Sequence, residues 1–96
     1  MPQIDRITYP NGKIYIGKDL TDTLTYFGSP NSALIATDFS GKDVTSFSIR
    51  KDILWRSDTA SPREVATAEV ALIREHRAND PAVGYNRWPT FADERP

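Results

Sequence analysis

The chain has 96 residues, of which 39% are hydrophobic and 26% charged, an ordinary composition for one globular domain with a modest core. Cysteine is absent and His76 is the single histidine, which excludes disulfides, thiolate zinc sites and multi-histidine metal cages. Any bound metal should therefore sit mainly on oxygen ligands. The formal net charge of −1 lacks the overall basic excess of many nucleic-acid binders, so a basic face would have to be local.

We expect neither a targeting segment at residues 1–5 nor a membrane-spanning segment in this sequence. Residues 1–5 lack a basic stretch followed by an apolar run, and no window approaches the length of a membrane span. We therefore expect a cytoplasmic protein without a membrane partner. The sequence predicts a single domain over residues 1–88 and a flexible C-terminal tail over residues 89–96, where periodicity is weak.

The first element that the sequence predicts is a β-hairpin. Asn11 and Gly12 stand between two β-rich runs, Ile4–Tyr9 and Lys13–Lys18. Both residues tolerate the positive φ of a type I′ turn, which makes this dipeptide a strong hairpin signal. A loop rich in Thr, Asp and Gly is expected next, from Asp19 to Pro30.

A short helix and a third strand are predicted to follow that loop. Asn31 is suited to cap a helix from Ser32 to about Phe39, and Gly41 is suited to end it. Between Val44 and Trp55 apolar and polar side chains alternate, which predicts a half-buried strand. Its expected apolar face consists of Phe47, Ile49, Ile53 and Trp55. Lys51 interrupts this face, which indicates a sheet edge or a bend there.

The best-marked helix begins after Ser61. Serine at the N-cap, Pro62 at the first helical position and Glu64 at the third form a capping box with a helix-compatible proline. The helix should run to about Ala78. The order strand, strand, helix, strand, helix predicts a small α+β fold, with helices packed on a mixed or antiparallel three-stranded sheet.

One carboxylate on this last helix falls on the side where apolar residues are expected. At about 100° per residue, Glu69 lies inside the stripe formed by Val65, Leu72, Ile73 and His76. An ionised group on a buried face is costly unless it is paired or bound to a cation. Glu69 is therefore a candidate metal ligand or ion-pair partner, unless the stripe ends at the edge of the core and the carboxylate reaches water or a surface arginine.

Three features in chain order resemble the GIY-YIG nucleases. They are Tyr15-Ile16-Gly17 after the hairpin turn, Glu69 on a late helix, and Gly84-Tyr85-Asn86 beyond it. The resemblance covers roughly Ile4 to Asn86. Gly17-Lys18-Asp19, followed by a threonine-rich loop that ends in aromatic-Gly-Ser, looks like a phage-type subgroup. The resemblance implies a DNA endonuclease with one Mg²⁺ or Mn²⁺ held by Glu69.

The sequence departs from the family pattern at two positions. Asp5 stands where the first tyrosine of the family is expected, and Tyr9 is the nearest tyrosine on the same side of that strand. The family arginine is also missing. Lys18 or Arg50 could supply a positive charge to a phosphate, although a solvated strand charge is the alternative for both.

The resemblance also suggests a role for each matching residue. Tyr15 would contact the attacking water or the phosphate, Asp5 would substitute as the base, and Asn86 would hold phosphate or pack against the metal site. A core position is the alternative for Tyr15, because aromatic strand residues usually pack inside.

Three functional hypotheses therefore remain open from the sequence. The first is a metal-dependent DNA endonuclease, whose short chain would need a homodimer or a separate partner for specificity. The second is a catalytically inactive relative that binds nucleic acid or protein. The third is an unrelated α+β interaction domain. Clustering of Tyr15, Glu69 and Asn86 would separate the first two hypotheses from the third.

Overall fold

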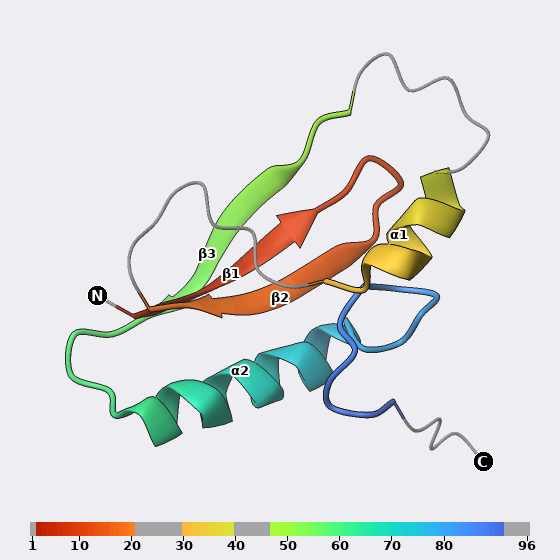
Figure 1. Cartoon of the computed structure of the whole chain (residues 1–96). Coiled ribbons are helices and arrows are strands. Elements are labelled where there is room, and N and C mark those ends of the chain that lie inside the picture. Colours follow the sequence, from red (N-terminus) through yellow and green to blue (C-terminus); the bar gives the residue numbers. More distant parts are fainter. Residues whose placement is uncertain (1, 21–29, 40–46, 92–96) are drawn as a thin grey trace.

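Among the described residues, three strands form one antiparallel sheet in the order β2-β1-β3, with two helices (Figure 1). This computed structural model describes residues 2–20, 30–39 and 47–91. The elements are β1 (Gln3–Thr8), β2 (Ile14–Asp19), α1 (Ser32–Phe39), β3 (Arg50–Arg56) and α2 (Pro62–His76). The predicted α+β class, element order and antiparallel alternative are confirmed. No helix in the described ranges is long and apolar enough to cross a bilayer.

The hairpin between β1 and β2 is confirmed, but the predicted type I′ turn is wrong. Of Asn11 and Gly12, only Gly12 has a positive φ, at 85°. The Gly12 N–H donates to the Tyr9 carbonyl at 2.9 Å, and the Tyr9 N–H donates to the Lys13 carbonyl at 2.9 Å. Pro10 therefore occupies the first central position of the turn, which its fixed φ suits, and Gly12 supplies the left-handed residue after it.

The prediction of one apolar face on β3 is also wrong, because the strand contains an extra residue. Asp5 on β1 lies opposite Ile53, whereas the neighbouring Ile4 lies opposite Trp55, so Leu54 is the additional residue of a β-bulge. Leu54 and Trp55 both pack against the cluster under α2, and Ile53 is left 50% exposed. Ile53 and Trp55, two residues apart, thus face opposite sides.

The N-terminal limits of both helices agree with the capping signals in the sequence. The side-chain oxygen of Asn31 accepts the Leu34 N–H at 3.1 Å. Ser61 and Glu64 form the predicted capping box, and the bond from the Ser61 backbone N–H lowers the pKa of the Glu64 carboxyl. α2 ends at His76, two residues earlier than expected, and Arg77 follows in the left-handed conformation. Gly41, the predicted stop of α1, lies outside the described residues.

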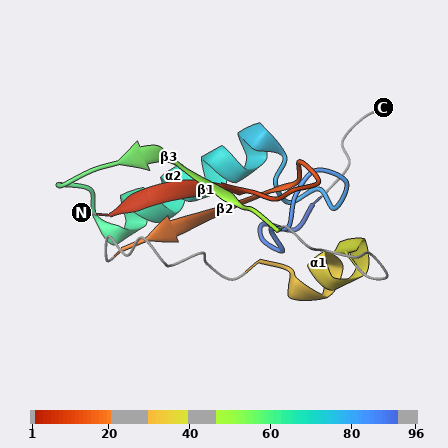
Figure 2. The same ribbon diagram turned by 90° about the horizontal axis from the view of Figure 1, so that it is seen from above.

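The two helices lie on opposite sides of the sheet (Figure 2). Below α2, one cluster combines Ile4 and Ile16 of the sheet with Ile73 of the helix. On the other face, a second cluster joins the sheet to α1; its buried members are Ile7, Tyr9 and Tyr85. Burial of these apolar side chains is the main force that holds the layers together.

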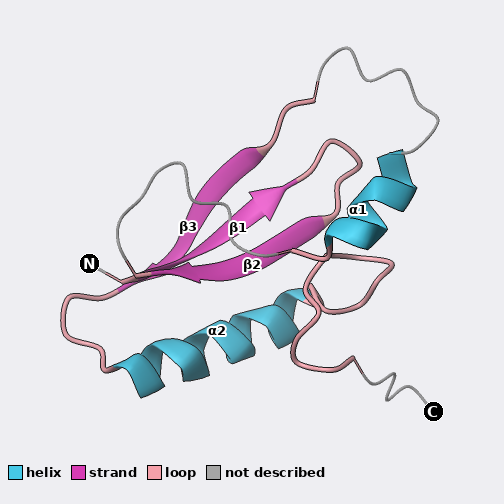
Figure 3. Cartoon of the chain, viewed as in Figure 1, coloured by secondary structure: helices cyan, strands magenta, loops and turns pink. Residues whose placement is uncertain are grey.

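The segment after α2 is mostly loop and passes the beginning of β2 (Figure 3). Pro89 is buried and its carbonyl accepts the Asn79 side-chain amide at 2.8 Å. The Arg77 guanidinium lies 5.5 Å from the centre of the Phe91 ring. The described part of the predicted tail, residues 89–91, therefore contacts the end of α2; residues 92–96 lie outside the described chain.

Candidate functional site

The outer edge of β2 is where the residues singled out from the sequence meet. At its beginning, the Ile14 N–H donates to the Val83 carbonyl at 3.1 Å, and the Tyr85 N–H donates to the Ile14 carbonyl at 2.8 Å. Gly84 between them forms a parallel bridge with Ile14. Residues 83–85 therefore pair with the outer edge of β2 as a neighbouring strand would, through a single bridge at Gly84.

Asn86 continues this edge with its side chain. Its Oδ1 accepts the Ile16 N–H at 2.8 Å, and its Nδ2 donates to the Ile16 carbonyl at 2.6 Å. The amide thus reproduces the hydrogen bonds that the peptide group of a neighbouring strand would make. Because both atoms are used on the main chain, Asn86 positions β2 and is not directed at a phosphate or metal.

Glu69 completes the same edge from α2. Its Oε2 accepts the Lys18 N–H at 2.8 Å, and the described residues make no hydrogen bond to its Oε1. Val65, one turn earlier, and Ile73, one turn later, are buried. The carboxylate is therefore tolerated on the apolar stripe because it ends at an otherwise unpaired strand N–H. A surface arginine is not its partner.

Tyr15 approaches this part of β2 from the other face. Its ring lies over Gly17: a Cβ placed on that glycine would be 2.7 Å from Cε2 and 3.1 Å from the hydroxyl oxygen of Tyr15. The tyrosine ring thus covers one face of the Gly17–Lys18 peptide. At the edge of the strand, the Lys18 N–H donates to Glu69. The structure brings Tyr15, Glu69 and Asn86 together on residues 15–18 of one strand.

The two candidates for the missing first tyrosine are buried away from Glu69. Asp5 is 4% exposed and lies on the face opposite α2, where its Oδ2 is 3.3 Å from Lys51 Nζ. Lys51 Nζ is also 3.9 Å from the buried Asp19. Tyr9 is 8% exposed, and burial raises the pKa of its hydroxyl. The geometry gives both residues a place in the fold and neither a path to a substrate.

The pairing of the buried Asp19 with the half-buried Lys51 is a feature that sequence interpretation misses. Asp19 was placed at the start of a loop, and Lys51 only as an interruption of an apolar face. What would identify them in the sequence is that each is a charged residue on the inward-facing side of a strand. It becomes readable only once the register opposite β1 is known.

Arg50, the alternative source of positive charge, is not part of the β2 edge. It lies on β3, with β1 between the two strands, and its Nε donates to Asp52 at 3.1 Å. Lys18 is exposed and its side chain makes no ion pair with the described residues. Of the two cations considered, only Lys18 is at the site.

Gly84 and Tyr85 also have structural explanations. A Cβ on Gly84 would lie 2.4 Å from the Ala78 carbonyl oxygen and 2.5 Å from that of Ile14, so only glycine fits between these backbones. The buried Tyr85 hydroxyl donates to Asp38 Oδ2 at 2.7 Å and accepts from the Asn11 side-chain amide at 2.9 Å. Burial, with Asp38 beside it, raises the pKa of Tyr85 to about 12.

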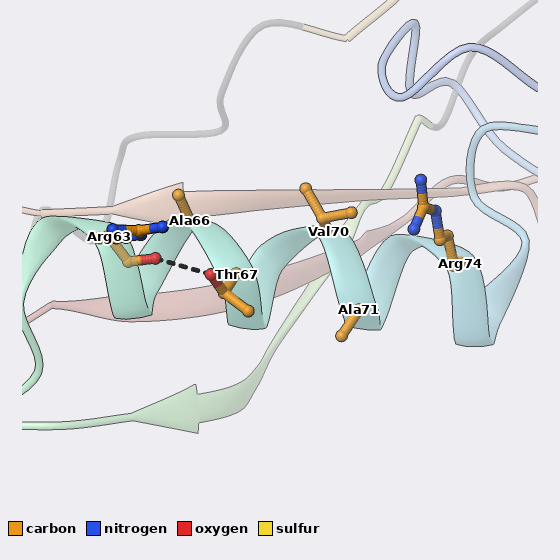
Figure 4. A pocket seen from close by; sticks show the side chains of 6 residues that line it. All are labelled: Arg63, Ala66, Thr67, Val70, Ala71 and Arg74. Carbon is orange, nitrogen blue, oxygen red and sulfur yellow. Dashed lines mark hydrogen bonds between the residues drawn. The ribbon is translucent and has the colours of Figure 1, made fainter.

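A second surface feature lies on the solvent side of α2. A shallow groove of about 450 Å³ runs between Arg63 and Arg74, with small apolar side chains between them (Figure 4). Neither arginine forms an ion pair with the described residues. This groove lies on the side of the helix turned away from Glu69, because positions 63 and 74 are roughly opposite position 69 at 100° per residue.

Comparison with known proteins adds no relative to these observations: no protein-family model, no curated protein and no solved structure matches the chain.

Proposed function

We propose that the protein is a GIY-YIG-like endonuclease that hydrolyses DNA phosphodiester bonds with one divalent cation, Mg²⁺ or Mn²⁺. The observation that carries the proposal is the meeting of Tyr15 and Glu69 at the Gly17–Lys18 peptide, one at its face and one at its edge. A tyrosine, a carboxylate and the exposed Lys18 are suitable groups for phosphodiester hydrolysis. The proposal also keeps the cytoplasmic location expected from the sequence.

Glu69 is the residue that would hold the cation. Its Oε1 accepts no hydrogen bond from the described residues, and Mg²⁺ typically keeps several waters while taking one or two protein carboxylates. Within the described ranges, no group of three His, Cys, Asp or Glu side chains could share a metal, so Glu69 would hold the ion there with at most one other such side chain. When bound, the ion would withdraw charge from the scissile phosphate and the leaving oxygen.

The other residues of the site have separate tasks in this proposal. The Lys18 ammonium attracts the phosphate, the Tyr15 hydroxyl orients the attacking water by a hydrogen bond, and Asn86 fixes the strand that carries both. Arg50, Asp5 and Tyr9 are left out, because the first is at the far strand and the other two are buried.

Nicking of supercoiled plasmid tests the proposal. With Mg²⁺, we expect Glu69→Gln to lower the nicking rate by about 100-fold, since several kcal/mol of charge stabilisation are lost. The amide oxygen can still accept the Lys18 N–H, so the melting temperature should change little. Glu75→Gln, an exposed carboxylate on the same helix, is the control. Equal trace activity of wild type and Glu69→Gln would contradict hydrolysis at this site.

A non-catalytic domain that binds nucleic acid or protein is the second candidate function. The observation that favours it is that Glu69 and Asn86 both hydrogen-bond to the main chain of β2, which gives each side chain a structural role. Under this alternative DNA binding would be weak and salt-sensitive, with no cleavage, and a homodimer or a separate partner would supply specificity. A DNA titration that is independent of salt would contradict an electrostatic interaction with nucleic acid.

A further inference from the structure

β2 ends over the first turns of α2 (Figure 1). A small cavity lies there, lined in part by Lys18, whose N–H Glu69 binds. It has a volume of about 210 Å³ and its lining is Pro2, Lys18, Leu20, Ala60, Pro62 and Val65. Val65 lies one helical turn before Glu69, and Lys18 is the residue whose N–H Glu69 holds. The cavity is therefore next to the carboxylate of the proposed nuclease site.

The lining specifies the chemistry of a ligand. Five of its six described lining residues are aliphatic or proline, and Lys18 is the one charged residue among these six. The volume is below the roughly 300–1,000 Å³ of pockets that hold drug-sized molecules, so one small ring system is the natural occupant. The faces of a nucleobase are flat and can pack between apolar side chains, and the phosphate of the same nucleotide suits the lysine, so a nucleotide fits this lining.

We infer that the cavity receives one unpaired nucleobase, with the phosphate next to that base drawn to Lys18. The inference rests on the proposed action on DNA and adds a substrate class to it. A base inside a duplex is stacked on both faces and cannot enter a closed pocket unless it leaves the stack. The protein therefore prefers DNA with an unpaired nucleotide, such as a bulge, a gap or a flap.

Fluorescence anisotropy with EDTA present tests this preference without cleavage. The probes are a labelled duplex, the same duplex with one unpaired thymidine, and the latter with an abasic residue in place of thymidine. We expect the wild type to bind the bulged probe about ten-fold more tightly than either other probe, a difference of about 1.4 kcal/mol in binding free energy. Absence of this preference, or of DNA binding altogether, would overturn the inference.

Two cavity variants and one control separate this effect from a change in folding. Ala60→Leu fills the cavity and should abolish the preference while leaving duplex affinity unchanged. Leu20→Asp acts at a residue that is 54% exposed, so it spares the core; it should abolish the preference by placing a carboxylate in the cavity, and it should also weaken duplex binding by repelling phosphate. Ala71→Leu, on the outer face of α2 (Figure 4), should behave as wild type.

The outcomes distinguish the cavity from the catalytic proposal. A preference that survives in both folded cavity variants would refute the base pocket, even if nicking depends on Glu69. Loss of the preference in these variants, without any nicking by the wild type, would support the pocket and remove the hydrolytic function. Lys18→Gln should weaken the binding of all three probes equally. It should also reduce the slope of log K against log salt concentration by about 0.9.

Discussion

The outer edge of β2 is completed by groups from the distant end of the chain, whereas the described residues place no strand or side chain along the outer edge of β3. Three successive outward N–H groups of β2 are bound: those of Ile14, Ile16 and Lys18. On β3, Arg50 and Ile53 are instead exposed. In the described chain the sheet thus has one edge whose N–H groups are bound and one edge with exposed side chains.

Among substitutions that test this comparison of the two edges, a change at Gly84 should cause the largest loss in the free energy of unfolding. In Gly84→Ala, the new methyl group meets two backbone carbonyls that cannot move independently, so we expect a loss of about 3 kcal/mol in the free energy of unfolding. Urea denaturation measures it. Gly12→Ala, where the added Cβ meets nothing within 4 Å but φ is 85°, should cost only about 1 kcal/mol. A similar cost for both variants would contradict the close packing at Gly84.

Removing the strand-like amide should have the next largest effect. Asn86→Ala deletes both hydrogen bonds to Ile16 and leaves its edge groups without a protein partner, at an expected cost of about 2 kcal/mol. Asn79→Ala, which loses one bond to Pro89, is the control and should cost about half as much. Hydrogen exchange of the Ile16 amide should accelerate in the first variant alone. An unchanged exchange rate would refute the role of Asn86 as an edge partner.

Alkaline pH should lower the free energy of unfolding through the buried Tyr85 hydroxyl. The Tyr85 pKa is about 12 in the folded chain and about 10 when unfolded, so between these values the folded state holds more protons. The contribution of Tyr85 to the free energy of unfolding is therefore fully present below pH 10. Above pH 10 it falls by at most about 1.4 kcal/mol per pH unit. In Tyr85→Phe, the part of this slope due to Tyr85 should vanish. An identical slope in the variant would assign the effect to other groups.

The β3 edge should give the smallest effect. Ile53→Thr changes an exposed side chain and should alter stability by no more than about 0.5 kcal/mol. Leu54→Ala, the neighbouring bulge residue packed on the α2 cluster, should cost about 2 kcal/mol. A larger loss at Ile53 than at Leu54 would show that the faces have been assigned the wrong way round.

Elements with strong local signals were predictable, and those set by pairing between strands were not. The Asn31 cap, the Ser61 capping box and the Asn-Gly hairpin depend on neighbours in sequence, and all three formed. The bulge at Leu54 depends on how β3 aligns with β1, which alternation within one strand does not reveal.

The candidate site shows the same division between local and non-local information. Helical periodicity placed Glu69 on the inner side of α2, and the structure explains its position by the Lys18 N–H. The roles of Gly84 and Asn86 could not be derived in this way. Their partners are backbone atoms of β2, about 70 residues earlier in the chain for Asn86, and backbone partners leave no trace in side-chain patterns.

The attachment of Glu69 to a main-chain N–H has a consequence for how position 18 can vary. Every amino acid except proline offers that N–H, so the link between α2 and β2 is indifferent to which side chain stands there. The charge at the mouth of the cavity can therefore be exchanged for another chemistry with the scaffold left intact. Under the proposed function, selection or design could change what this surface binds by replacing one side chain that the fold does not need.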